Sequence, residues 1–276
     1  MTARPTVAIV IPVRNGMPYL EEALESALAA EGIDEVVVRE NGSTDGTAEW
    51  LTERAQRGDF TLLVAETPGS AAENWTTVAS AVSTDYVKLL CADDYLLPGG
   101  IERQVAAAVE TPDAVLIASK RRVIDESGRT VVGSHGIGGV AGPHDGAAVA
   151  RKAVLGGRNP FGEPSAVLFR RDALAASLPF DGSHPYVIDL DMYVRVLSRG
   201  RFVGLSTTDA AFRVSTTSWS AAIGSDQARQ FDAWVTDLVA TRRLVAGRVA
   251  LGIARVRIRA VFAARRVVTR LAALRR

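Results

Sequence analysis

The chain has 276 residues, of which 47% are hydrophobic and 23% charged, a composition typical of one large globular domain with or without an appendage. Its single cysteine, Cys91, excludes an intrachain disulfide framework and suits a reducing compartment, so we expect a cytoplasmic location. The formal net charge of +1 hides an asymmetry, because residues 242–276 hold eleven arginines and no acidic residue. The rest carries 21 basic against 31 acidic residues, a split that predicts two functions or an internal electrostatic contact.

Apolar strand patterns and amphipathic helix patterns alternate through the first half of the chain. The first apolar run, residues 6–13, is too short to span a membrane and lacks a signal-peptide cleavage pattern, so we interpret it as a buried strand. The patterns that follow predict helices at 19–30, 42–55, 73–82 and 99–110, and strands at 35–40, 60–66, 85–92 and 114–119. Helices of this length between strands predict right-handed crossovers and an α/β fold with a mostly parallel sheet.

The pattern changes between about residue 126 and residue 162, where the sequence is glycine-rich and weakly periodic. We expect a flexible excursion there, with a hairpin and a mobile loop. Regular structure is predicted again at 165–174, in a helix at 189–200 and in a strand at 201–206.

Polar residues stand at the ends of three predicted strands. They are Arg14 and Asn15 after the first strand, Glu40 and Asn41 after the second, and Asp93 and Asp94 after the fourth. Because the carboxyl ends of parallel strands share one edge of a sheet, and open α/β folds bind ligands there, we expect these side chains to line one site.

The acidic pair in "LLCADDYLLPGG" indicates a metal site at this edge. Adjacent carboxylates repel each other unless a cation compensates their charge. Magnesium or manganese takes one or two carboxylates and fills its shell with water and substrate phosphates. The alternative interpretation is an ordinary acidic pair on the surface.

Two further segments place polar groups beside predicted helices. "NGSTDGT" (41–47) is a tight turn between a strand and a helix, and helix capping alone would explain it. "YVIDLDMYVRV" (186–196) puts Asp189 and Asp191 at the start of a helix, where the helix dipole favours carboxylates. Arg195 lies four residues after Asp191, so a structural ion pair is the alternative to a catalytic role.

Taken together and in order, these segments resemble the inverting family 2 glycosyltransferases with the GT-A fold. The segments are "VIPVRNGMPYLEEALESAL", "VVVRENGSTDGT", "YVKLLCADDYLLPGGIE", "PSAVLFRR" and "DLDMYVRVLSRG", within roughly residues 5–215. The resemblance implies a GT-A catalytic domain over 1–215, Rossmann-like with flanking helices. A C-terminal helical extension would follow over 216–276, basic from residue 242.

The resemblance also implies roles for individual residues. The nucleotide pocket would be lined by Pro12, Val13, Arg14, Asn15, Glu40 and Asn41, with Glu40 near the base. Asp93 would face the ribose, Asp94 would hold Mn²⁺ or Mg²⁺, and Arg213 would contact the diphosphate. Asp189 would be the general base, with Asp191 and Arg195 structural or on the acceptor side. Two further acceptor-side candidates are His184, five residues before Asp189, and Glu163, which could equally anchor a loop.

The sequence departs from the family pattern at four places. Arg14 stands where a tyrosine is frequent, Glu40-Asn41 replaces a pair of aspartates, Ile188 replaces an acid, and Ser215 replaces a histidine. These changes bear on metal geometry and on the nucleobase of the donor, for which UDP or dTDP is favoured.

The implied reaction is metal-dependent transfer of a sugar from a nucleotide-diphosphate sugar to an acceptor hydroxyl, with inversion. Asp189 would accept the hydroxyl proton as that oxygen attacks the anomeric carbon. The expected products are cell-envelope polysaccharides, glycolipids or related glycoconjugates. One alternative is a sugar-phosphate nucleotidyltransferase, although "IPVRNGMPYL" lacks the expected glycine-rich loop with Arg and Lys. The other is a non-catalytic sugar-nucleotide-binding or scaffold protein of the same fold.

Residues 242–276 are predicted to form one basic amphipathic helix. The apolar stripe comprises Val245, Val249, Ile253, Val256, Ala260, Val267, Leu271 and Leu274. The neighbouring basic stripe comprises Arg248, Arg255, Arg259, Arg266 and Arg270. This pattern suits an anionic membrane surface, a peripheral location at the inner face of the membrane and a lipid-linked acceptor. The alternative is a helix docked on the acidic catalytic domain or on a second subunit of a homodimer. No nucleic-acid partner is expected, because only Phe262 could stack on bases.

Overall fold

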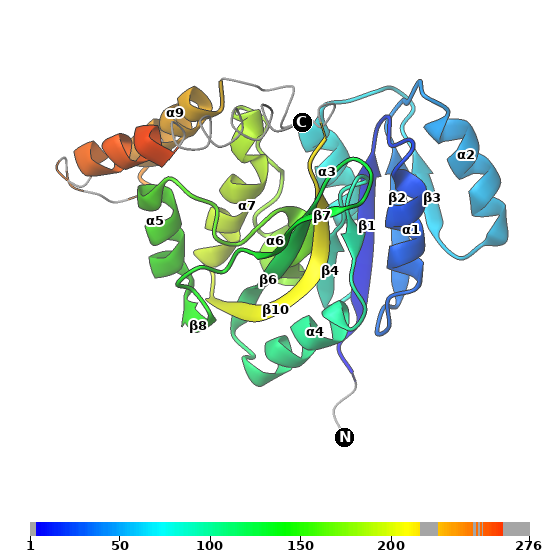
Figure 1. Cartoon of the computed structure of the whole chain (residues 1–276), viewed down its shortest axis with the longest axis horizontal. Helices are drawn as coiled ribbons and strands as arrows, with labels where there is room; N and C mark the ends of the chain where they lie inside the picture. The colour runs from blue at the N-terminus through cyan, green and yellow to red at the C-terminus, as the bar shows by residue number, and fades with distance from the viewer. Residues whose placement is uncertain (1–3, 216–225, 245–246, 248, 250, 262–276) are drawn as a thin grey trace.

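The computed structural model describes residues 4–215, 226–244, 247, 249 and 251–261 (Figure 1). Within these residues, ten strands form one sheet in the order β3-β2-β1-β4-β9-β6-β10-β5, with β7 beside β6 and β8 beside β10. Helices flank the sheet, and the C-terminal helical segments lie beside α5 and α7 (Figure 1).

The N-terminal half follows the predicted alternation of strands and helices. The strands are β1 (Val7–Val13), β2 (Glu35–Glu40), β3 (Thr61–Val64) and β4 (Tyr86–Leu89). The helices are α1 (Leu20–Leu28), α2 (Thr47–Arg54), α3 (Ala71–Ser80) and α4 (Gly100–Glu110), with a 3₁₀ turn at Ala55–Arg57. β1 pairs in parallel with both β2 and β4, and β2 pairs in parallel with β3. The predicted parallel arrangement is therefore confirmed for this half.

The other half of the sheet is mixed. Its strands are β5 (Tyr95–Leu96), β6 (Ala114–Ile124), β9 (Val167–Arg170) and β10 (Arg201–Arg213). β9 lies antiparallel between β4 and β6, whereas β10 runs parallel to β6. The short helices here are α6 (Arg171–Ala175) and the 3₁₀ turns Pro164–Ala166 and Pro185–Val187, and α7 spans Ile188–Leu197.

Side-chain alternation along β1 divides the interior into two layers. Val7, Ile9 and Ile11 point into one apolar cluster, which α1 and α4 also line. Ala8 and Val10 point into a second cluster, which α3 and α7 line from the opposite face. Both faces of β1 are thus buried, which explains its continuous apolar sequence. The polar residues at the strand's carboxyl end are left at the edge of the sheet.

The glycine-rich segment is more regular than we predicted. The expected hairpin is present, because β7 (Thr130–His135) pairs antiparallel with β6. β8 (Gly142–Asp145) pairs with β10, and a helix follows, α5 (Gly146–Gly156), in place of the expected mobile loop. Asp145 caps α5 by accepting a hydrogen bond from the Ala148 amide, 2.8 Å long. The helix was missed because alanine and glycine weaken its apolar pattern.

The described part of the C-terminal extension is docked on the rest of the chain. Helix α9 (Gln227–Ala240) buries Phe231, Trp234 and Leu238 in the apolar cluster that also contains α7. Helical residues 251–261 bury Ala254 and Ile258, and Ile258 approaches Gly157 at the end of α5. The expected domain boundary at residue 215 stays a prediction.

The prediction of a single helix over 242–276 is only partly within the described residues. Residues 242–244 are not helical, whereas 249 and 251–261 are. Several residues of the predicted stripes lie outside the described part, namely Val245, Arg248, Arg266, Val267, Arg270, Leu271 and Leu274. Among the described helices, none has both the length and the apolar content needed to cross a bilayer.

Candidate functional site

Two loops at the carboxyl end of the parallel strands are tied to each other. Asn15, which follows β1, has a left-handed backbone (φ 54°). Its amide donates to the Ser43 hydroxyl (2.9 Å), and its side-chain oxygen accepts from the Thr44 amide (2.8 Å). Pro12 and Val13 are buried in β1, whereas Arg14 and Asn15 are exposed. The "NGSTDGT" segment therefore holds the loop after β1 and leaves the Arg14 side chain free of the core.

Glu40 and Asn41, at the end of β2, are buried, and their side chains hydrogen-bond to the loops at this edge of the sheet. The Glu40 carboxylate accepts hydrogen bonds from the amides of Gly42 (3.0 Å) and Ser43 (2.5 Å). Burial acts to raise the pKa of Glu40, but the hydrogen bonds from Ser43 and Gly42 outweigh it and lower that pKa. The Asn41 side chain exchanges two hydrogen bonds with the backbone of Gly69. Both residues are placed at the predicted edge, where their contacts are with protein backbone.

The acidic pair after β4 differs sharply between its two members. Asp94 is 1% exposed, and its two carboxylate oxygens accept hydrogen bonds from the Arg213 amide (3.0 Å) and from the Ser165 hydroxyl (2.5 Å). Asp93 is half-buried, and no other described residue donates a hydrogen bond to its carboxylate. Asp94 therefore joins three segments of the chain, whereas Asp93 presents free oxygen atoms.

Cys91 completes a cluster with these two aspartates. One ligand atom from each of Cys91, Asp93 and Asp94 lies within 4.8 Å of the other two. Burial is the main cause that raises the pKa of both carboxyls, and for Asp94 the charge of Asp93 adds to it. Two carboxylates this close are stabilised by a cation, and oxygen ligands suit Mg²⁺ or Mn²⁺. The residues present thus fit a divalent metal.

Arg213, at the end of β10, is buried in a dense set of contacts. Its guanidinium donates to the Asp93 carbonyl (3.0 Å) and to the Asp125 carbonyl (3.2 Å), and it pairs with the Glu22 carboxylate. The guanidinium carbon also lies 4.3 Å from the centre of the Tyr19 ring. The predicted contact of Arg213 with a diphosphate stays a prediction, and in this structure its donors are directed to protein acceptors.

Asp189 lies at the first turn of α7, and its charge contributes to the raised pKa of the Cys91 thiol in the acidic cluster. Its carboxylate accepts hydrogen bonds from the Leu190 amide (2.7 Å) and from the side chain of Asn159 (3.0 Å). Burial raises the pKa of Asp189 to about 7, and the Leu190 amide opposes that rise. A carboxylate that exchanges its proton near neutral pH has the property that a general base requires.

Glu163 links the acidic cluster to Asp189. Its charge contributes to the raised pKa of Asp93, Asp94 and Asp189, so Glu163 lies within electrostatic reach of each of these three carboxylates. Glu163 itself pairs with Arg121 of β6, with one hydrogen bond of 3.0 Å. The ion pair with Arg121 is the loop-anchoring contact that was one of the two roles considered for Glu163, and it lies beside the candidate site.

Asp191 and His184 contact the C-terminal extension, whereas Arg195 pairs with Asp191 and donates to the carbonyls of Ser177 and Pro179. Asp191 is 2% exposed and accepts hydrogen bonds from Arg195 (2.8 Å), from the Trp234 indole (2.9 Å) and from Arg243 (2.7 Å). His184 contacts the Asp237 carboxylate of α9 at 2.7 Å. The expected ion pair of Asp191 with Arg195 is present. These residues join α7 to α9, and their assignment to an acceptor pocket stays a prediction.

Sequence reasoning gave no role to several residues that build the site. Ser165 holds Asp94, Asn159 holds Asp189, and the buried Lys88 donates to the carbonyls of Ser165 (2.9 Å) and Val167 (3.1 Å). Burial lowers the pKa of Lys88 to about 7. Ser165 belongs to the quoted "PSAVLFRR" segment and could have been singled out, whereas nothing local in the sequence marks Asn159.

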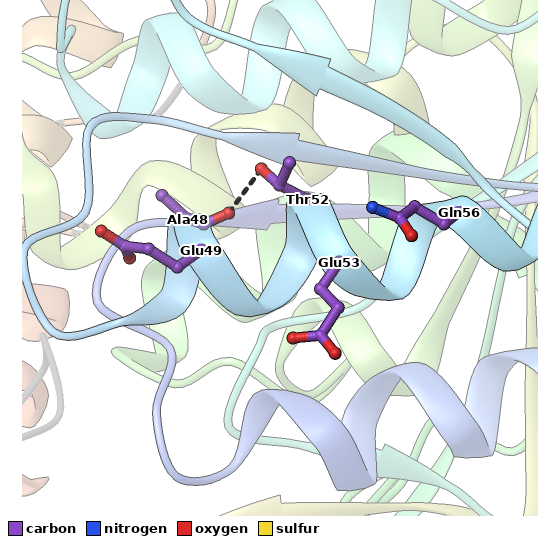
Figure 2. Close-up of a pocket in the computed structure, with 5 residues that line it drawn as sticks. All are labelled: Ala48, Glu49, Thr52, Glu53 and Gln56. Atoms are coloured by element: carbon purple, nitrogen blue, oxygen red, sulfur yellow. Dashed lines mark hydrogen bonds between the residues drawn. The ribbon is translucent and has the colours of Figure 1, made fainter.

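A separate surface depression carries none of these residues. Figure 2 shows the side chains that line it, Ala48, Glu49, Thr52, Glu53 and Gln56, all from α2 and the turn after it. The Thr52 hydroxyl donates to the Ala48 carbonyl, as in an ordinary helix (2.8 Å). Because this hollow lies along one helix and away from the acidic cluster, we assign it no chemistry.

Comparison with known proteins gives one family match. Residues 8–178 match the family model described as Glycosyl transferase family 2. A curated relative is the uncharacterized protein MT1568 of Mycobacterium tuberculosis (strain CDC 1551 / Oshkosh), 26% identical over 207 residues. The alignment covers 71% of this chain and 63% of that protein, so the chain spans less than two thirds of the relative's length.

Two solved structures share the fold. The TarS 1–349 fragment of S. aureus has a TM-score of 0.65 and 16% identity, with 92% of this chain and 70% of that chain covered. The mannosyltransferase PcManGT from Pyrobaculum calidifontis, solved with GDP-Man and Mn²⁺, has a TM-score of 0.61 and 17% identity. The alignment covers 99% of this chain and 81% of that one. The predicted GT-A architecture is therefore confirmed.

Proposed function

Because the chain belongs to glycosyl transferase family 2, we propose that it transfers a sugar from a nucleotide-diphosphate sugar to an acceptor hydroxyl, with inversion at the anomeric carbon. The observation that carries this proposal is that Glu163 lies within electrostatic reach of both the Asp93–Asp94 pair, after β4, and Asp189, at the start of α7. The pKa of Asp189 is raised by burial to about 7. These positions would suit a metal-bound leaving group at the aspartate pair and a proton acceptor at Asp189.

We propose that Asp93 is the principal metal ligand and that Asp94 supports it. The resemblance implied another assignment, with Asp94 on the metal and Asp93 facing the ribose. The contacts favour Asp93 as the metal ligand. Both carboxylate oxygens of Asp94 are hydrogen-bonded within the protein, whereas those of Asp93 accept from no other described residue. Mn²⁺ or Mg²⁺ at Asp93 would supply positive charge to the diphosphate leaving group. The mannosyltransferase neighbour was solved with Mn²⁺, which supports this choice of cation.

Asp189 is proposed as the general base. Its carboxylate is held in place by the Asn159 side chain and by the Leu190 amide. Each carboxylate oxygen has a second lone pair with which to accept a proton from the acceptor hydroxyl. Removal of that proton as the oxygen attacks the anomeric carbon makes the displacement a single step, and the configuration inverts.

The nucleotide is proposed to lie against the loop after β1, beside Arg14 and Asn15. The hydrogen bonds of Glu40, Asn41 and Ser43 hold the loops at this edge of the sheet in place without a ligand. Arg14 is exposed there, and its planar guanidinium can stack on a base. The UDP and UDP-GlcNAc of one solved neighbour support a uracil base, with thymine as its close analogue, and the GDP-Man of another makes guanine the alternative to test.

The acceptor is proposed to be a hydroxyl on a lipid-linked or polymeric glycan. The predicted alternative of a sugar-phosphate nucleotidyltransferase has no support in the family match. The other alternative is a non-catalytic sugar-nucleotide-binding protein of the same fold. Such a protein would bind the donor without turning it over, so an assay of donor turnover distinguishes the two.

A thermal-shift screen tests the donor site directly. The purified chain is heated with UDP, dTDP, GDP and their sugar conjugates, each with and without Mn²⁺. We expect one base to raise the Tm, and the rise to require Mn²⁺, since a ligand that binds only the folded state stabilises it. A Tm that no nucleotide diphosphate changes would overturn the proposal.

A further inference from the structure

A stripe of exposed aliphatic side chains runs along the last described helix. Val249 is 78% exposed, Ile253 48% and Val256 68%. In a helix these positions are spaced by four and three residues, so their side chains share one face. Among the other large exposed aliphatic residues in the described part of the chain, no element carries more than two, the pair being Val131 and Val132 on β7. An exposed apolar stripe on a single helix calls for a partner surface.

The opposite face of the same helix is already occupied. Ala254 and Ile258 are each 1% exposed, and Ile258 approaches Gly157 of the α5 terminus. Arg255 donates to the Thr236 hydroxyl (3.2 Å) and pairs with Asp232 (3.3 Å), both on α9. These contacts fix the helix about its own axis, so the stripe of Val249, Ile253 and Val256 is presented outward by packing.

Arginines border this outward stripe on both sides. At 100° per residue, Arg257 falls on one side of the stripe, and Arg255 and Arg259 fall on the other. Arg257 and Arg259 are exposed and form no ion pair with another described residue. The two carboxylates within α9 are already engaged, Asp232 by Arg255 and Asp237 by His184. The border of the stripe therefore carries uncompensated positive charge.

We propose that this face is a docking surface for an anionic lipid bilayer. Aliphatic side chains would enter the boundary between headgroups and acyl chains, and the flanking guanidinium groups would meet anionic headgroups. A second copy of the chain is a poorer occupant, because a symmetric contact through this stripe would bring arginines against arginines. The proposal rests on the exposed face and its charges, and it does not depend on the glycosyl transfer proposed above.

The position of the helix gives the docking surface a use. Figure 1 shows α9 and the last helix on the same side of the molecule as the carboxyl end of β1, where the candidate site lies. A bilayer bound there would hold the chain with its candidate site at the membrane end of the molecule.

Vesicle co-sedimentation of the whole chain tests the proposal. The probes are vesicles of phosphatidylcholine with phosphatidylglycerol, and vesicles of phosphatidylcholine alone, at low and at high salt. We expect the chain to sediment with the anionic vesicles at low salt and to be released by salt, since the attraction is screened. Equal binding to both lipids, or no binding to either, would overturn the proposal.

Two pairs of variants assign the binding to this face. Ile253→Asn with Val256→Asn should weaken vesicle binding on the order of tenfold or more, because two aliphatic side chains no longer enter the lipid. Arg257→Gln with Arg259→Gln should weaken it on the order of tenfold and reduce its salt dependence. The matched controls are Val109→Asn with Val131→Asn, and Arg57→Gln with Arg201→Gln, all at exposed positions.

The controls should bind vesicles as the unchanged chain does, and the Tm of every variant should stay the same, because each changed side chain is exposed. Loss of binding in the controls as well would show that the attraction is not specific to this face, and the proposal would fail. A dimer that Ile253→Asn with Val256→Asn dissociates, seen by sedimentation velocity, would identify a second copy as the occupant and would also overturn it.

Discussion

Asp93 and Asp94 are adjacent in the chain but stand in different surroundings. Asp94 is enclosed by the Ser165 hydroxyl and the Arg213 amide, which come from segments far along the sequence. Asp93 keeps its carboxylate half-buried beside Cys91. Asp94 therefore joins distant segments of the chain, whereas the carboxylate of Asp93 is available to a cation.

This difference predicts opposite effects of two substitutions. Asp94→Ala leaves two buried donors without an acceptor, so we expect the free energy of unfolding to fall by about 2–6 kcal/mol. Asp93→Ala should leave the Tm unchanged or higher, because it removes a like charge, and should abolish the Mn²⁺-dependent stabilisation by nucleotide. Urea unfolding and a Mn²⁺ titration measure the two effects. If Asp93→Ala retained Mn²⁺-dependent nucleotide binding, the sequence-based assignment of the metal to Asp94 would be favoured.

At the residue scale, the sequence points to candidate site residues but not to the residues that contact them. Asp93 and Asp189 could be found because they stand at a strand end and a helix start within recognisable segments. Their partners could not, because Ser165 and Asn159 reach the site through pairings and loops that no local pattern encodes. The raised pKa of Asp189 is likewise a consequence of burial, which depends on the whole fold.

Helices α7 and α9 are joined through one buried carboxylate. Asp191 of α7 receives hydrogen bonds from Trp234 of α9 and from Arg243, which follows α9, in addition to Arg195 of its own helix. The helix that starts with Asp189 is therefore also the helix on which the C-terminal extension is anchored. Displacement of α9 would remove the hydrogen bonds of Trp234 and Arg243 and leave the buried Asp191 carboxylate with Arg195 alone.

Asp191→Ala should consequently destabilise the protein. We expect a loss of about 3–5 kcal/mol in the free energy of unfolding, because Arg195 and Arg243 lose a buried partner. The control is Glu53→Ala, at an exposed position on α2, which should change stability by less than about 0.5 kcal/mol. Urea unfolding measures both. Undiminished stability combined with lost transfer activity would instead place Asp191 at the acceptor, as the sequence also allowed.

At the element scale, the sequence predicts the parallel half of the sheet well because strands and helices alternate there with clear periods. It does not predict that β9 enters antiparallel between β4 and β6, because strand direction in a sheet is decided by contacts distant in sequence. It also ends β10 too early, at residue 206, since polar residues from Ser206 to Asp209 interrupt the apolar pattern before the strand continues to Arg213.

The whole molecule resolves the charge asymmetry of the sequence in two ways. Part of the basic extension is used internally, through Arg243 with Asp191 and Arg255 with Asp232. Of the remaining described arginines, Arg257 and Arg259 border an exposed apolar stripe. From the sequence, docking on the catalytic domain and binding to a membrane were alternatives. In the structure one face of the last helix packs on the rest of the chain, and the opposite face is exposed and available for the proposed membrane contact.

The central claim is that the chain cleaves a sugar nucleotide with Asp189 as the base. The most direct test is the pH profile of nucleoside diphosphate release from the donor, for the unchanged chain and for Asp189→Asn. Because a buried Asp189 gains its proton near pH 7, release should fall about tenfold per pH unit below about 7 and level off above it. Asp189→Asn should bind the donor as before and release almost no nucleoside diphosphate at any pH. Release by Asp189→Asn at the unchanged rate, with the same pH profile, would contradict the account.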